Sequence, residues 1–138
     1  MMTTTNFIKV IVPIFLFVCS SELMAQDSDL KASMSRGEEL YNDLCITCHM
    51  PNGEGVEKVF PPLAKSDFLV NFPKKSIRAV KYGMSGEITV NGQTYSTAMA
   101  NPGLSDDEVA DVMNYINHSW GNTINSLITE EEVSKIEE

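Results

Sequence analysis

The sequence is poor in several residue types that define whole classes of protein. It has only three cysteines, two histidines and one tryptophan in 138 residues. Its 10 lysines and arginines are outnumbered by 19 aspartates and glutamates, which gives a formal net charge of -9. Because nucleic-acid binding requires a basic face, a nucleic-acid partner is not expected. The acidity suits an exported protein that is kept soluble by its charge, or one steered toward positively charged docking surfaces.

A long apolar run is also missing, although the first 25 residues have the organisation of a secretory signal peptide. Lys9 precedes an apolar stretch over residues 10–18, and a cleavage site follows at Ala25. The stretch is well short of the roughly 20 apolar residues of a membrane-spanning helix. We therefore expect residues 1–25 to be removed, leaving a periplasmic or otherwise exported protein without a membrane span. The alternatives are an uncleaved anchor and lipidation at Cys19.

One motif carries the chemical interpretation of the chain. The segment over residues 45–49 reads Cys-Ile-Thr-Cys-His, and Cys-x-x-Cys-His is the attachment pattern of c-type haem. The thiols of Cys45 and Cys48 lie one helical turn apart and can each form a thioether with one vinyl group of the porphyrin. His49 follows directly, so its imidazole is placed to bind the iron. The sequence thus predicts one covalently bound haem c.

Two other chemistries use the same pair of cysteines. A redox dithiol of the thioredoxin type requires a surrounding βαβ pattern, which the sequence lacks. A zinc site requires two further ligands, and the remaining candidates are Cys19, within the predicted leader, and His118. Haem attachment is therefore the preferred interpretation.

The mature chain is expected to form one small domain. Removing the leader leaves about 113 residues, without an internal repeat or a second haem motif. We divide them into an N-terminal linker over residues 26–34, a domain over residues 35–122 and an acidic tail over residues 123–138. Since so small a core is marginal alone, the haem-free chain is expected to be poorly folded.

Local signals predict the elements of this domain. Caps, breakers and apolar periodicity mark each of them. They predict a first helix capped by Ser33 or Ser35, a rigid segment over residues 60–63, a helix over residues 74–82 ending at Gly83, a hairpin turning at Asn91-Gly92, a helix capped by Ser105 that runs to about Trp120, and a short terminal helix after Thr129.

The order of these features resembles class I cytochrome c: Cys-x-x-Cys-His after a short helix, a Pro-Pro-Leu segment, a loop methionine and a terminal aromatic helix. The resemblance covers about residues 35–121. It implies an all-α fold whose helices wrap around one covalently bound haem, with a small β-hairpin before the loop of the methionine ligand. It also implies that Gly37 and Tyr41 meet the last helix near Tyr115.

The resemblance implies that Met99 is the sixth iron ligand. Met99 follows the hairpin and matches the family's ligand methionine by position, although Ala100 and Asn101 here precede the proline that usually comes directly after it. A looser ligand loop is therefore expected. Met84 is the main alternative, and a bis-histidine site with His118 is another. The remaining methionines of the mature domain are assigned to packing: Met34, Met50 and Met113.

The other ring nitrogen of His49 needs a partner that fixes its tautomer. In the resembled family a proline carbonyl accepts this N–H. The Pro-x-Leu pattern favours Pro61, and spacing leaves Pro62 open.

Function follows from these assignments as an expectation. A six-coordinate haem implies one-electron transfer between redox protein donors and acceptors, by a monomer that is not itself an enzyme. The alternative is a stably bound electron-transfer subunit of a periplasmic dehydrogenase, nitrite reductase or oxidase. A sensor or haem enzyme with an open iron site ranks last, because no distal catalytic histidine or acid–base pair is evident.

Charge is unevenly distributed between two of the predicted helices. The helix over residues 74–82 carries cations, and the helix after Ser105 begins with acids. A dipolar molecule is expected, although a solvated helix face explains such a pattern equally simply. The residues are Lys74, Lys75, Arg78 and Lys81 on the first, and Asp106, Asp107, Glu108 and Asp111 on the second.

Overall fold

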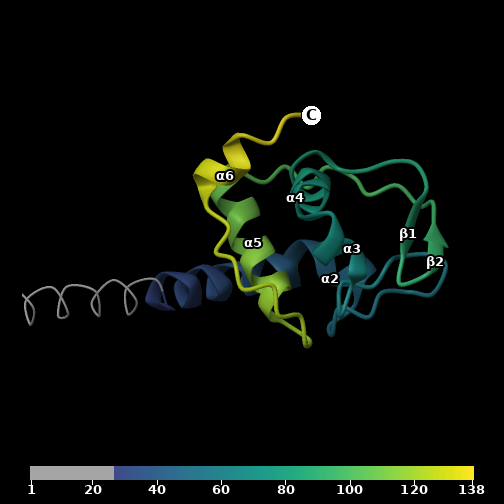
Figure 1. Ribbon diagram of the computed structural model, residues 1–138, viewed down its shortest axis with the longest axis horizontal. Coiled ribbons are helices and arrows are strands. Elements are labelled where there is room, and N and C mark those ends of the chain that lie inside the picture. Colours follow the sequence, from purple (N-terminus) through teal and green to yellow (C-terminus); the bar gives the residue numbers. More distant parts are fainter. Residues whose placement is uncertain (1–26) are drawn as a thin grey trace, which may run out of the picture. The chain divides into compact units, whose positions relative to one another are not determined.

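The computed structural model describes residues 27–138 (Figure 1). The chain divides into two compact units, of which the second spans Ser33–Glu138 and contains the haem motif. In the first unit, residues 27–32 are helical. The predicted signal peptide over residues 1–25 lies outside the described residues.

The unit Ser33–Glu138 is mostly helical, with one small antiparallel sheet, as expected for an all-α fold with a hairpin (Figure 1). Residues 33–40 are helical and lead into a π-helical turn. The elements that follow are η1 (Tyr41–Cys45), α2 (Ile46–His49), α3 (Asp67–Asn71), α4 (Pro73–Tyr82), β1 (Ile88–Val90), β2 (Gln93–Tyr95), α5 (Asp106–His118) and α6 (Glu130–Ser134).

The beginning of the first helix differs from the prediction. Residues 27–40 are helical, so neither Ser33 nor Ser35 caps the helix, and most of the predicted linker over residues 26–34 is helix. The physical reason lies in the tertiary structure. The Ser33 hydroxyl is buried and donates to the Asp111 carboxylate at 2.6 Å, so it is not available to cap a helix end.

The first helix crosses α5 closely, as the resemblance implied. Gly37 lies directly against the backbone of Asp111 and the Cβ of Tyr115. One turn later the Tyr41 ring packs on Tyr115 and on Trp120, with ring centroids 5.5 and 4.9 Å apart. Such tilted aromatic pairs add to the stability gained by burial. The crossing therefore fixes the helical segment that leads to the cysteines.

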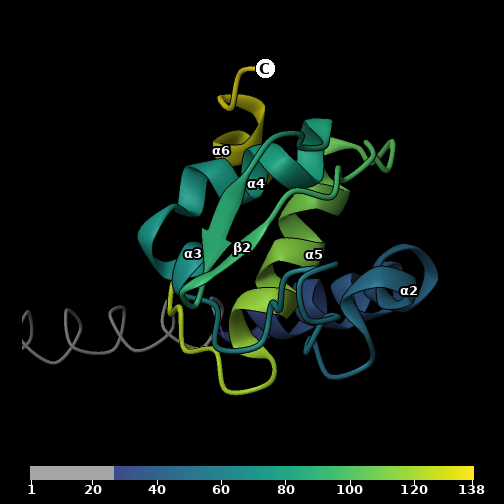
Figure 2. The same cartoon turned by 90° about the vertical axis from the view of Figure 1, so that its right-hand side faces the viewer.

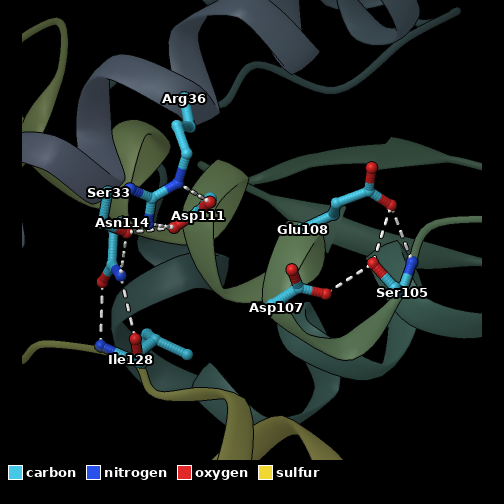
Figure 3. A network of polar contacts seen from close by, with 8 residues as sticks. All are labelled: Ser33, Arg36, Ser105, Asp107, Glu108, Asp111, Asn114 and Ile128. Carbon is cyan, nitrogen blue, oxygen red and sulfur yellow. Dashed lines mark hydrogen bonds and ion pairs between the residues drawn. The ribbon is translucent and has the colours of Figure 1, made fainter.

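The predicted capping box at the start of α5 is present. The Glu108 carboxylate accepts from the backbone N–H of Ser105 at 2.9 Å, and the Ser105 hydroxyl donates to Asp107 at 2.6 Å (Figure 3). The helix ends at His118, two residues before the predicted end at Trp120. Trp120 adopts a left-handed backbone conformation with φ of 51°, which a right-handed helix cannot contain. Its ring packs on Tyr41.

The predicted helix over residues 74–82 and the predicted hairpin are confirmed. α4 begins at Pro73, a favoured first helical residue, and stops at Gly83 with φ of 81°. Asn91 and Gly92 both have positive φ, as the tight turn requires. Asn91 and Asp67 exchange two hydrogen bonds, which attach the turn to the start of α3; Figure 2 shows the hairpin beside α3.

The C-terminal tail packs on the domain. The predicted terminal helix is confirmed as α6, with the Thr129 side chain accepting from the N–H of Glu132. Val133 is fully buried and Ile128 is 5% exposed, and both belong to the core cluster around α5. The Asn114 amide binds both the N–H and the carbonyl of Ile128 (Figure 3). The segment after the predicted boundary at residue 122 therefore packs into the same hydrophobic core as the domain before it.

Candidate haem site

The Cys-x-x-Cys-His motif lies on two consecutive short helices. Cys45 is the last residue of η1, whereas Cys48 and His49 belong to α2, and all three side chains line one cavity. π-Helical turns widen the backbone and are frequent at functional sites. The Tyr41 hydroxyl donates to the carbonyl of Met50 at 2.7 Å. This bond ties the end of α2 to the aromatic cluster at the helix crossing.

The geometry around His49 leaves one ring nitrogen free for a metal. Nδ1 lies 3.0 Å from the carbonyl oxygen of Pro61, not of Pro62. Burial lowers the pKa of His49, and the hydrogen bond to the Pro61 carbonyl opposes that effect in part. A neutral imidazole that donates through Nδ1–H carries its lone pair on Nε2. That tautomer is the one that ligates iron, and the carbonyl makes the ligand more basic.

Gly55 has a role at this bond that the sequence did not reveal, because it read only as a helix breaker. Its φ is 65°, and its N–H donates to the carbonyl of His49 at 3.0 Å. A Cβ at this position would lie 2.7 Å from the Pro61 carbonyl oxygen. A glycine there therefore lets the Pro61 carbonyl stay beside the imidazole. The only sign of this role in the sequence is a glycine six residues before Pro61, and that spacing acquires a meaning only once the structure is known.

The cavity is mainly apolar and has a volume of about 390 Å³. Its walls come from the motif, the segment over residues 60–63, α3, α4, the hairpin, the loop before α5, and α5 itself. A flat apolar macrocycle fits such a lining, since apolar walls with a few convergent polar groups are typical of cofactor sites. Together with two thiols and an oriented imidazole, the donor set matches haem c.

Met99 and Met84 lie opposite each other on the cavity wall. Each donates its N–H to the other's carbonyl, at 2.9 and 2.8 Å, and both side chains line the cavity. Gly83, with φ of 81°, packs against the carbonyl of Met99 so closely that a Cβ would lie 2.7 Å from the oxygen. Met113 on α5 also lines the cavity. The structure thus brings Met99 to the site but brings Met84 with it.

His118 is directed elsewhere. Its Nδ1 lies 2.9 Å from the carbonyl of Asn114, one turn earlier on α5, and its side chain is not among those that line the cavity. The bis-histidine alternative therefore receives no support from the geometry.

The Cys45 thiol is poorly ionised in its buried position. Burial, and secondarily the neighbouring Cys48, raise the pKa of Cys45 to about 11. The thiol form therefore dominates at neutral pH, and thiolate reactions such as disulfide exchange are slow.

Comparison with known proteins gives one consistent answer. A sequence model of the family described as cytochrome c matches residues 34–120. The cytochrome c subunit of the quinone-type alcohol dehydrogenase of Gluconobacter oxydans is 34% identical over 104 residues, covering 72% of this chain and 21% of that protein. Cytochrome c-552 of Thermus thermophilus is 33% identical over 116 residues, 78% of each chain. The gluconate 2-dehydrogenase cytochrome c subunit of Pantoea cypripedii is 25% identical over 127 residues.

Fold, donor set and relatives together define a haem-binding domain of the kind found in cytochromes and in the cytochrome c subunits of dehydrogenases. The chain belongs to the cytochrome c family, in its class I monohaem form, and carries covalently bound haem c. It spans about a fifth of the length of the Gluconobacter subunit. Within residues 27–138 we find no helix long and apolar enough to cross a membrane.

Proposed function

We propose that the protein is a periplasmic one-electron carrier whose single haem is attached to Cys45 and Cys48 and ligated by His49 and Met99. One observation carries the proposal. The motif and the loop of Met99, which are about fifty residues apart in the sequence, line the same apolar cavity. Its iron, when the haem is bound, supplies the ferric–ferrous couple.

The protein's residues would hold both iron ligands in place when haem is bound. His49 is fixed by the Pro61 carbonyl, and the backbone of Met99 is fixed by two hydrogen bonds to Met84. A thioether is a soft ligand that favours ferrous iron and raises the potential relative to a second imidazole. With His49 and Met99 both bound to the iron, no position would be left for a substrate, and the ligands would need little rearrangement when the charge changes. These properties suit electron transfer.

Position in the family's order of elements supports Met99 over Met84, since Met99 lies between the hairpin and the capped start of α5. The test is visible spectroscopy of the haem-loaded wild type, Met99→Ala and the matched control Met84→Leu, oxidised and reduced, with carbon monoxide added to each reduced sample. We expect the methionine-to-ferric-iron band in wild type and Met84→Leu, without carbon monoxide binding. Met99→Ala is expected to lose the band and bind the gas. A Met99→Ala spectrum identical to wild type would overturn the assignment and direct the search to Met84 or His118.

A second candidate role is that of a stably bound electron-transfer subunit, because several relatives are named as cytochrome c subunits of dehydrogenases. The protein would then remain bound to its enzyme. Co-purification at native expression levels separates the two roles: a stoichiometric complex that survives gel filtration indicates a subunit, whereas a free monomer indicates a shuttle.

Export is supported by the pattern of residues 1–25, which is typical of a secretory signal peptide. It also agrees with the proposed haem, which in this interpretation is attached to the two thiols outside the cytoplasm. Mass spectrometry of the periplasmic protein is expected to show a chain that begins near residue 26. A cytoplasmic chain that retains Met1 would contradict the proposal.

A further inference from the structure

The outer face of α4 carries three cations that have no acidic partner. Lys74, Lys75 and Arg78 are exposed, whereas Ser76 and Ile77 on the opposite face are buried. Within residues 27–138, none of the three forms an ion pair. Among the described residues, Arg36, Lys81 and Lys135 form ion pairs, with Asp111, Asp106 and Glu131, whereas the exposed Lys31, Lys58 and Lys65 form none. Lys74, Lys75 and Arg78 differ from these three lysines because they lie together on one face of one helix.

The position of these cations also opposes the local electrostatics of the helix. Lys74 and Lys75 lie in the first turn of α4, where the helix dipole disfavours positive charge, and the turn contains no acidic residue. Phe72 at the cap has no polar side-chain atom that could accept from the exposed N–H groups. A local rule is thus broken, with the contact between the Lys75 ammonium and the Phe72 ring as a local gain, and such departures are found at functional sites.

A shallow groove of about 280 Å³ lies beside these cations. Lys74, Lys75 and Arg78 line it from α4, and residues 135–137 line it from the C-terminal segment. Glu137 is its one carboxylate. Next to it, Phe72 is 44% exposed and lies under the Lys75 ammonium, 4.8 Å from the ring centroid. Aromatic side chains and arginine, here Phe72 and Arg78, are enriched at protein interfaces.

We propose that this basic face, defined as Lys74, Lys75 and Arg78 with Phe72, is a docking surface for a carboxylate-rich patch on a partner protein. The identity of that partner as a redox protein rests on the proposed function. The surface itself does not, because its charge and exposure are independent of the haem.

A protein fits this face better than an anionic membrane. Both fields are screened within about 8 Å, but a membrane is a wide negative plane that also approaches the acidic side chains around the basic face of this chain, whose net charge is -9. An acidic cluster on a protein is small enough to meet mainly the basic face. Membrane insertion also needs an exposed apolar helix face. On α4 the apolar residues Ile77 and Ala79 are buried in the domain.

The basic face is separated from the exposed lining of the cavity. The inner side of α4 contributes Ser76, Ala79 and Val80 to the cavity wall, so a partner on the outer side lies about one helix diameter, roughly 10–12 Å, from it. The exposed lining residues belong largely to the loop over residues 97–101. One partner bound at the basic face would therefore leave that loop free for a second.

The test is an NMR titration of the full-length mature, haem-loaded, reduced protein with poly-L-glutamate as the acidic probe. We compare wild type with Lys74→Glu/Lys75→Glu/Arg78→Glu and with the control Lys31→Glu/Lys58→Glu/Lys65→Glu, which makes the same change in net charge at three other exposed lysines. Wild type is expected to bind with shifts confined to residues 72–78 and 135–137, weakening as salt is added. Reversal of the basic face is expected to weaken binding about tenfold or more, and the control much less.

Three results would overturn the proposal: equal loss in the control, shifts centred on residues 97–101, or binding to phosphatidylglycerol vesicles but not to poly-L-glutamate. Thermal unfolding shows whether the variant is folded, and a neutral set, Lys74→Gln/Lys75→Gln/Arg78→Gln, replaces it if not. The visible spectrum of each sample separates the two proposals. An abnormal haem spectrum with intact binding counts against the haem ligation, and a normal spectrum without binding counts against the docking surface.

Discussion

Gly37→Ala is expected to destabilise the protein, although alanine normally stabilises a helix. Gly37 lies in the first helix where it crosses α5, and an added Cβ would lie 2.6 Å from the carbonyl carbon of Asp111 and 2.9 Å from the Cβ of Tyr115. Both atoms belong to α5, and one is backbone, so no flexible side chain can move aside. The two helices themselves would have to separate.

The expected magnitude combines two opposing effects. Ordinary van der Waals contact begins at 3.4 Å, so the crossing would have to open by about 0.8 Å at the Asp111 carbonyl carbon and by more at the Asp111 carbonyl oxygen, which is the nearest atom. Overpacking of this kind costs about 1–3 kcal/mol, occasionally more, and contacts with backbone belong at the upper end. The gain in helix propensity is about 1 kcal/mol. We therefore expect a net loss of about 2 kcal/mol, which lowers the Tm by roughly 10 °C in a domain of this size.

The assay is guanidinium and thermal unfolding of the haem-loaded variant, followed by far-ultraviolet circular dichroism and by the haem absorbance. Ser35→Ala is the matched control, because it adds an alanine at an exposed position of the same helix. A Gly37→Ala protein as stable as this control would refute the close crossing.

Two further predictions concern the tail and the aromatic cluster. Val133→Ala is expected to lower the free energy of unfolding by about 1–3 kcal/mol, because Val133 is fully buried in the core cluster; an unchanged value in denaturant unfolding would mean that the tail does not stabilise the domain. Burial raises the pKa of Tyr41 above its ordinary 10.0, so the unfolded chain ionises first, and this contribution to stability is constant below pH 10 and falls above it. Tyr41→Phe is expected to flatten the alkaline loss measured by denaturation at successive pH values, and an equally steep loss would contradict this.

Elements with strong local signals were predictable from the sequence. α4 depends on Pro73 and Gly83, the hairpin on Asn91-Gly92, and α5 on its capping box. The errors arose where a distant residue decides the outcome. Ser33 reads as a cap in the sequence, yet its hydroxyl is bound by Asp111, 78 residues later. Packing of the tail likewise depends on Asn114, whose amide pairs with Ile128 across 14 residues.

The same distinction applies to the haem site. The two cysteines and His49 lie within five consecutive residues of one motif, so spacing alone identifies them. The contact of Pro61 with His49 requires a sharp turn at Gly55, which spacing does not describe. The sixth ligand stays a prediction, because the backbone pairs Met84 and Met99 at the cavity wall and the bond to iron decides between them.

The central claim, a closed site for one-electron transfer, is tested most directly by a potentiometric titration of the wild-type protein, followed in the visible spectrum with and without carbon monoxide. We predict a single reversible one-electron transition per chain, with the same midpoint potential in both titrations. Carbon monoxide binds ferrous iron and therefore raises the midpoint wherever a coordination position is open. A higher midpoint under the gas would contradict the account and identify a ligand-binding haem protein.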